Sequence, residues 1–306
     1  MCRTGGRRCG RAYNMRLNLD DIRGVVNQAQ KYRGKADPSN SRRQPIRRLA
    51  NYQRKLQAEE YNIDHALDAL TADVAGRDLI EGEVTAYNEN GEEFTLQLQR
   101  PAPRFDGEGI EEQLSKEELM KVSSKKLSMT ELREQHPDVY DAIHQVNGKD
   151  SRDFLPEAFA KGEFEKRHSR YRNDYTKPVG SEDPAKVIDQ IVYLTERQKE
   201  VKALKSEVKA TLADSLPVGT KMEPAWPQHG GFSSSSVEIV ETHESVTEKK
   251  VRDWAKATPG KGDEVLSDIS RTTPDSAKIK RHFPELYESR RTKESKPKVK
   301  VTKKKK

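Results

Sequence analysis

Three basic stretches of the sequence carry the residue types that bind nucleic acids. The first, RRQPIRRLANYQRK, covers residues 42–55 and is predicted to form an amphipathic helix. Its polar side carries Arg43, Arg47 and Arg54. Because arginine side chains contact phosphate oxygens along a nucleic-acid backbone, we predict that these three bind phosphates. The alternative is a helix face that is only solvated.

The second stretch, EKRHSRYRNDY at residues 165–175, interleaves cations with aromatic rings. Single-strand-binding surfaces use this combination, in which charge attracts phosphates and rings stack on bases. The alternative is a helix end whose tyrosines pack inward. The residues that we predict to act here are Arg167, Arg170, Tyr171, Arg172 and Tyr175.

The third stretch, KESKPKVKVTKKKK, closes the chain at residues 293–306. It contains eight lysines and one acid, so its net charge of +7 equals that of the whole chain. Such a segment is typical of an electrostatic arm that adds affinity without reading sequence. The alternation in KVKVT also permits a strand, which would leave four lysines free to bind phosphates, namely Lys303, Lys304, Lys305 and Lys306.

No stretch of the sequence has the spacing of a catalytic or metal site. The seven histidines include no H-E-x-x-H pair, and phosphate loops, dinucleotide fingerprints and nucleophile elbows are missing. Cys2 and Cys9 cannot form a zinc site without further ligands. We therefore expect no enzyme activity, no cofactor and no metal. Three E-x-K triplets fall on predicted helices as ion-pair faces, at Glu200/Lys202, Glu207/Lys209 and Glu248/Lys250.

The composition predicts small modules rather than one large core. Hydrophobic residues make up 32% of the 306 residues and charged residues 35%, against a usual charged share of about 25%. No apolar run reaches the roughly 18 residues that span a bilayer, and residues 1–14 lack the apolar core of a secretory signal. We expect a cytoplasmic protein, with residues 1–14 as a leader or a mis-start before Met15.

The N-terminal part, residues 15–100, is predicted to be a helical hairpin followed by a β-hairpin. We expect a first helix that ends near Gly34, and a later helix capped by Asp64. Further along, Phe94, Leu96 and Leu98 alternate with polar residues, as in a half-buried strand, and Asn90-Gly91 is a strong turn signal.

The remainder is predicted to be short elements joined by linkers. Ser128 with Glu131, and Ser245 with Glu248, have the spacing of capping boxes, and a further helix is expected to start at Thr273. Pro137 suits the first turn of a helix, and VEIVETH at residues 237–243 indicates a strand. No internal repeat of useful length is evident. The expected segments are a linker at 101–127, short helices at 128–176, a linker at 217–236, an α+β module at 237–290 and a basic disordered tail at 291–306.

Residues 184–216 are predicted to form one long helix with a narrow apolar stripe. Its outer face mixes Glu, Lys and Arg, as on a coiled coil. Such a stripe needs a partner helix, from the same chain or from a second copy, and we expect a dimer through this helix. The stripe consists of Val187, Ile191, Leu194, Val201, Leu204, Val208 and Leu212.

The order of features in residues 184–302 is a long charged helix, a Pro/Gly break, the strand region VEIVETHESVTEKKVRDW and the string KIKRHFPELYE. This part resembles accessory proteins of tailed bacteriophages that accompany DNA recombination or protect DNA ends. The resemblance implies a small α+β module on a coiled-coil stalk, acting with DNA-processing machinery in the host bacterial cytoplasm. It carries over no catalytic residue.

We therefore predict a mainly helical α+β protein that serves as a non-enzymatic, nucleic-acid-associated accessory factor of phage DNA recombination or replication. Two alternatives stay open. One is a phage structural or assembly protein, such as a scaffold or packing protein, that works through the long helix. The other is an inhibitor of a host nuclease or defence complex, whose acidic faces would mimic DNA.

Overall fold

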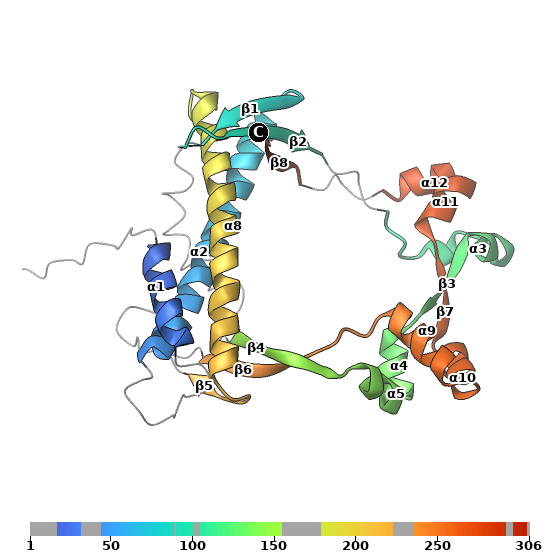
Figure 1. The fold of residues 1–306 in the computed structure, drawn as a ribbon. Helices are drawn as coiled ribbons and strands as arrows, with labels where there is room; N and C mark the ends of the chain where they lie inside the picture. Colours follow the sequence, from blue (N-terminus) through green and yellow to red (C-terminus); the bar gives the residue numbers. More distant parts are fainter. Residues whose placement is uncertain are drawn as a thin grey trace, which may run out of the picture. The chain divides into compact units, whose positions relative to one another are not determined.

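The protein is a mainly helical α+β protein, which confirms the predicted fold class. The chain forms two compact units, and each unit is assembled from separated segments. The first takes its residues from Met1–Leu98, Asp150–Val240 and Val299–Lys306, and the second from Gln99–Lys149 and Glu241–Lys298. The computed structural model describes residues 17–31, 44–88, 90–100, 105–154, 179–222, 236–291 and 296–304 (Figure 1).

Three helices form the body of the first unit: α1 (Leu19–Gln30), α2 (Gln44–Gly76) and α8 (Pro184–Ser215). Helix α2 contacts α8 along its length, and α1 packs on both. The predicted break before Asp64 is wrong, because α2 continues through it. Buried residues recur at helical spacing on both sides of this position, so the core favours one continuous helix. Helix α1 ends at Gln30, ahead of the expected Gly34.

The long helix is confirmed at residues 184–215, and its apolar stripe is covered from within the chain. All seven stripe residues are buried, in one core with the apolar faces of α1 and α2. The partner helices of the stripe therefore come from the same chain. A dimer stays a prediction, and it would have to use a surface other than this stripe.

The first unit also holds a three-stranded sheet in the order β1-β2-β8. Strands β1 (Glu83–Tyr87) and β2 (Glu93–Gln99) form the predicted hairpin, with Gly91 at a φ of 71° in its turn. Strand β8 spans Lys298–Lys303 and lies beside β2. The prediction of a disordered tail is therefore wrong for these residues. Val299 and Val301 pack against the core, and this burial holds the strand in place.

A second three-stranded sheet has the order β4-β6-β5. Strand β6 (Ser236–His243) is the strand predicted from VEIVETH, and it pairs antiparallel with β5 (Lys221–Met222). Its third strand is β4 (Val146–Phe154). The presence of β5 corrects the expectation that residues 217–222 belong to a linker.

The second unit is built from short elements. They are η2 (Ile110–Glu112), α3 (Lys116–Val122), β3 (Ser123–Leu127), α4 (Met129–Gln135), α5 (Pro137–Ile143), α9 (Glu248–Ala257), α10 (Lys261–Asp268), β7 (Ser270–Pro274), α11 (Ser276–His282) and α12 (Pro284–Ser289). Residues 105–127 are thus not a linker. The sequence reading missed the capping box of Ser115 and Glu118, which starts α3.

The N-cap residues of the helices in the second unit agree with the predictions at some positions and differ at others. Ser128 caps α4 and Pro137 begins α5, as predicted. Helix α9 is capped by Thr247 rather than Ser245. Residues 270–274 form β7, so the cap of α11 is Asp275 rather than Thr273. For α11, the pairing of residues 270–274 with β3 moves the helix start to Asp275, whose carboxylate is a good cap by type.

The two halves of the second unit repeat one pattern, 147 positions apart, which overturns the expectation of no repeat. In each half a helix leads into a strand, then a capped seven-residue helix, then a corner with proline at the start of the next helix. The corner residues have nearly the same backbone, with φ and ψ of −131° and 60° at His136 and −135° and 66° at Phe283. The equivalent pairs are Val122/Ile269, Ser128/Asp275, Leu132/Ile279, Pro137/Pro284 and Tyr140/Tyr287.

A two-fold axis relates these halves through the β3–β7 ribbon. The strands pair antiparallel with Lys125 opposite Thr272, and these central residues are also 147 positions apart. The flanking backbone bonds exchange in the same way: Ser128 N donates to Ile269 O, and Asp275 N donates to Val122 O, each at 2.9 Å. The second unit is therefore a pseudo-symmetric pair of modules joined by one ribbon.

Candidate nucleic-acid interface

Of the residues predicted to bind nucleic acid in the basic helix and the arginine-tyrosine stretch, Arg47 and Arg54 lie in the described part of the chain. Arg47 is exposed on α2, as a phosphate contact requires. All three guanidinium nitrogens of Arg54 are buried, which does not favour a phosphate contact, and its binding of phosphate stays a prediction. The other predicted residues of these two stretches lie outside the described part of the chain, as do two terminal lysines: Arg43, Arg167, Arg170, Tyr171, Arg172, Tyr175, Lys305 and Lys306.

The two remaining lysines of the C-terminal stretch are fixed on the β1-β2-β8 sheet. Lys303 Nζ lies 2.6 Å from Glu92 Oε1, and Lys304 Nζ lies 2.5 Å from Glu93 Oε1. The backbone N of Lys304 also donates to Glu93 O at 3.0 Å. The hydrogen bond to Glu93 raises the pKa of Lys304 above its ordinary value of 10.5. The prediction that the side chains of Lys303 and Lys304 are free of contacts within the protein is therefore wrong.

The exposed face of this sheet carries an aromatic ring next to these charges. Tyr87 is 57% exposed, although its ring is large and apolar. It pairs across the hairpin with Glu93, and Glu93 in turn binds Lys304. Tyr87 and Glu93 are directly opposite on paired strands and therefore lie on one face. Lys304, the residue after β8, extends this row through its two bonds to Glu93.

Strand alternation identifies the rest of that face. Phe94 and Leu96 point into the core, so the residues between them, Thr95 and Gln97, point outward. Thr85 of β1 is opposite Thr95 and shares its face.

In β8, Val299 and Val301 pack inward, which leaves Lys300 and Thr302 outward and exposed. Within the part of the chain that the structure describes, no ion pair holds Lys300.

We call this surface the tyrosine–lysine face, defined by Tyr87, Thr85, Thr95, Gln97, Lys300, Thr302 and Lys304. Two acids share it, Glu93 opposite Tyr87 and Glu83 opposite Gln97. It offers a ring that can stack, amide and hydroxyl groups that can bond to base edges, and cations that attract phosphate. Sheet faces with exposed aromatic residues bind single-stranded nucleic acids in this way. The sequence reading missed Tyr87, because a single aromatic residue in a hairpin gives no pattern.

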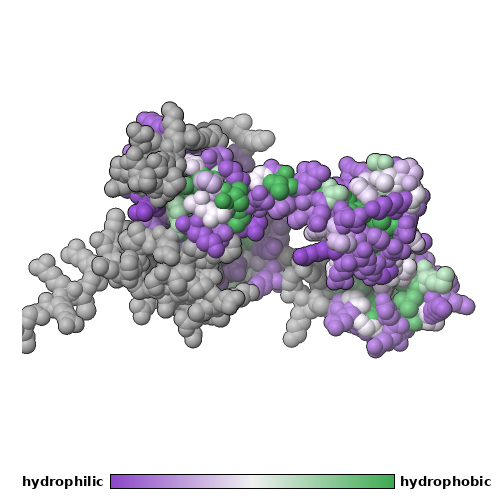
Figure 2. Space-filling view, turned by 90° about the horizontal axis from the view of Figure 1, so that it is seen from below, coloured by the Kyte–Doolittle hydropathy of each residue, from purple (hydrophilic) through white to green (hydrophobic). Residues whose placement is uncertain are grey.

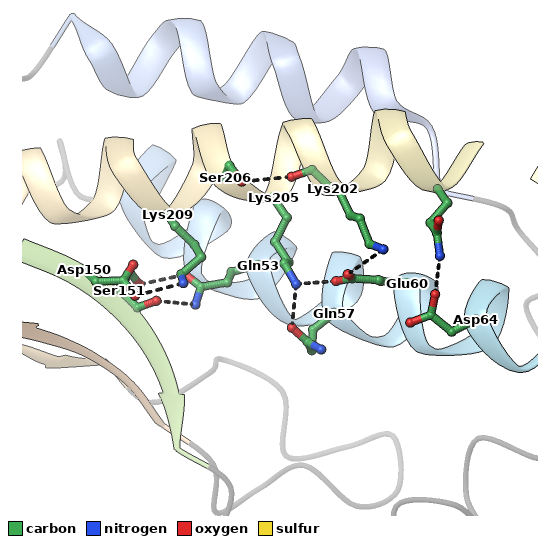
Figure 3. A network of polar contacts seen from close by, with 11 residues as sticks. Gln53, Gln57, Glu60, Asp64, Asp150, Ser151, Lys202, Lys205, Ser206 and Lys209 are labelled. Atoms are coloured by element: carbon green, nitrogen blue, oxygen red, sulfur yellow. Dashed lines mark hydrogen bonds and ion pairs between the residues drawn. The ribbon is translucent and has the colours of Figure 1, made fainter. Parts of the chain in front are cut away.

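A separate polar network lies at the edge of the α2–α8 pair and serves the fold (Figure 3). Gln53 Nε2 donates to Ser151 O at 3.0 Å, and Ser151 Oγ donates to Gln53 Oε1 at 2.7 Å, with both residues buried. Lys209 and Lys202 reach Asp150 and Glu60 at 2.9 and 3.8 Å. The lysines of two E-x-K triplets are thus engaged in ion pairs on a helix, as the sequence indicated.

No group of three His, Cys, Asp or Glu side chains is placed to hold a metal ion within the described ranges. Nor is any described helix both long and apolar enough to cross a bilayer. Figure 2 shows one face of the molecule on which hydrophilic residues predominate and hydrophobic residues form smaller patches.

Comparison of the chain with models of protein families, with characterised proteins and with solved structures gave no match. The geometry of the tyrosine–lysine face is thus the main basis for assigning a function.

Proposed function

We propose that this protein is a non-enzymatic, nucleic-acid-binding accessory factor, as in phage DNA recombination or replication, and that the tyrosine–lysine face contacts single-stranded nucleic acid. One observation carries the proposal: Lys300 of strand β8, and Lys304 directly after it, lie on the same face as the exposed ring of Tyr87. The sheet then fixes the positions of these lysines relative to Tyr87, so that they contribute by their placement as well as by their charge.

Each part of the face has a distinct contribution. Stacking of one base on an aromatic ring is worth about 1–3 kcal/mol and tolerates any base. Lys300, which no ion pair holds among the described residues, binds phosphate by releasing counterions, and one single-strand contact adds about 0.7 to the salt slope. Thr85, Thr95 and Gln97 can bond to whichever base edges are presented. The resulting binding is sequence-tolerant and weakens as salt rises.

The proposal is tested by fluorescence anisotropy with a labelled single strand, from about 50 to 200 mM salt. Tyr87→Ala should weaken binding by about 5-fold or more, with the salt slope unchanged. Lys300→Gln should lower the slope by about 0.7. The matched control is Lys186→Gln, which removes one charge from a lysine that is 70% exposed on α8. Equal effects of Lys300→Gln and Lys186→Gln, with no effect of Tyr87→Ala, would overturn the proposal.

The assembly alternative loses its main support. It relied on the apolar stripe of α8 as a contact for other proteins, and that stripe is buried against α1 and α2. No observation on the described residues favours the inhibitor alternative, which would need an acidic face that resembles DNA. We therefore propose no second function.

A further inference from the structure

The β3–β7 ribbon of the second unit has an unbalanced charge. Its ten residues include three cations, Lys125, Lys126 and Arg271, and no acid. All three cations are exposed. Arg271 is partnered by Glu131 of α4, with 2.6 Å between Nε and Oε1. For Lys125 and Lys126, no acidic partner occurs among the residues that the structure describes.

The register of the ribbon brings like charges together. Lys126 is directly opposite Arg271, so both side chains leave the same face of the ribbon. Like charges in directly opposite positions destabilise a strand pair. The Glu131 carboxylate offsets the charge of Arg271, whereas Lys126 beside it has no acidic partner among the described residues. Because neighbouring residues of a strand alternate between faces, Lys125 leaves the other face of the ribbon, so each face carries one exposed lysine that can bind an anion.

The two-fold axis adds a second, independent feature. Arg133 of α4 and Lys280 of α11 are equivalent positions of the repeat, and both are exposed. A cation thus flanks the ribbon on each side of the axis. A protein two-fold is matched by the two antiparallel strands of a nucleic-acid duplex, which is why symmetric readers bind palindromic sites.

We propose that the β3–β7 ribbon is a binding site for double-stranded DNA, in which the ribbon enters the major groove and Arg133 and Lys280 contact phosphates of opposite strands. Two strands about 4.8 Å apart fit a groove about 12 Å wide. The deep and narrow major groove of an RNA duplex does not admit such a ribbon. The site lies in another unit and binds another form of nucleic acid, so it is independent of the tyrosine–lysine face.

The test compares the intact protein and a double variant, Lys125→Gln with Lys126→Gln, on a DNA duplex, an RNA duplex and a single strand of about 20 nucleotides, by anisotropy. Duplex DNA binding should weaken about 10-fold at about 150 mM salt, with a salt slope lower by about 2, while single-strand binding changes less than about 2-fold. The charge-preserving variant, Lys125→Arg with Lys126→Arg, should retain the affinity for duplex DNA.

The matched control is Lys249→Gln with Lys256→Gln, which removes the same charge from exposed positions of α9 in the same unit. Circular dichroism and thermal unfolding confirm that each variant is folded. The proposal is overturned if the control variant weakens duplex binding as much as the ribbon variant does. It is also overturned if the folded ribbon variant binds duplex DNA with the affinity of the intact protein, which is the result expected for a ribbon that binds an acidic protein instead. Equal losses on DNA and RNA duplexes would contradict the groove assignment.

Discussion

Glu93 holds Lys304 to the hairpin by an ion pair of 2.5 Å and by a backbone hydrogen bond of 3.0 Å from Lys304 N to Glu93 O. This relationship makes the basic C-terminal segment the third strand of a sheet. It also brings Lys304 to the same face as Tyr87, because Glu93 pairs with Tyr87 of β1 on one side and bonds to Lys304 on the other. The proposed function follows from this placement more than from the number of lysines.

The first prediction concerns this ion pair. Glu93→Gln should increase hydrogen exchange of the β8 amides by about two- to five-fold, as the loss of a surface pair allows. Because the pKa of Lys304 is raised on folding, its contribution to stability is complete below about 10.5 and is lost as the pH rises through the folded value. Glu196→Gln, which removes a pair within α8, is the control. Unchanged exchange in β8 would show that Val299 and Val301 hold the strand alone.

The second prediction uses the repeat as its own control. The Ser124 hydroxyl, followed by the backbone N–H groups of Lys278 and Ala277, lowers the pKa of Asp275 below its ordinary value of 3.8. Its contribution is therefore complete above 3.8 and is lost as the pH falls through the lower, folded value. Asp275→Asn should remove this acid dependence from α11, as monitored by NMR of the helix amides. The equivalent cap of α4, Ser128, does not titrate, so α4 should keep its structure over the same range.

The third prediction concerns the buried pair in Figure 3. Ser151→Ala removes the donor to Gln53 Oε1 and should lower the free energy of unfolding by about 1–3 kcal/mol, because the buried acceptor is left without that bond. Ser206→Ala, also drawn in Figure 3, removes an exposed bond to Lys202 O and should change stability by less than about 0.5 kcal/mol. Chemical denaturation monitored by circular dichroism compares them. Equal effects would mean that Gln53 finds another donor.

The fourth prediction contrasts two glycines. A Cβ on Gly262 would lie 2.6 Å from Ala255 Cα and closer still to Ala255 O, so Gly262→Ala should destabilise the α9–α10 contact by about 1–3 kcal/mol or more. Gly24 lies exposed within α1 with no atom within 4 Å of its would-be Cβ. Gly24→Ala should stabilise by about 0.5–1 kcal/mol. Thermal unfolding measures both, and effects of the same sign would contradict the packing at Gly262.

Sequence patterns predicted the parts of this fold that depend on local signals. The Asn90-Gly91 turn with its alternating neighbours predicted the β1–β2 hairpin, and the spacing of apolar residues predicted α8. The same reasoning missed β3 and β7, because SSKKL and SRTTP are polar and are stabilised by pairing with residues 147 positions away. Non-local pairing of this kind leaves no periodic signal in either segment.

The repeat and the candidate face could have been recognised in part. HPDVYD at 136–141 and FPELYE at 283–288 match at every position by residue type, except for the ring at the first. Comparing them would have suggested the repeat. The tyrosine–lysine face needed β8 to be placed beside β2, and the sequence gives only the alternation of Val299 and Val301. Its partner strand could not be inferred from that pattern.

The measurement that tests the central claim most directly is photo-cross-linking of the intact protein to a single strand that carries 5-iodouracil, with the cross-linked peptide identified by mass spectrometry. Stacking on Tyr87 predicts that the main cross-link lies in the hairpin, at Tyr87, and that Tyr87→Phe retains binding while Tyr87→Ala loses the cross-link. Cross-links that fall only outside residues 83–99, with affinity unaffected by Tyr87→Ala, would contradict the account.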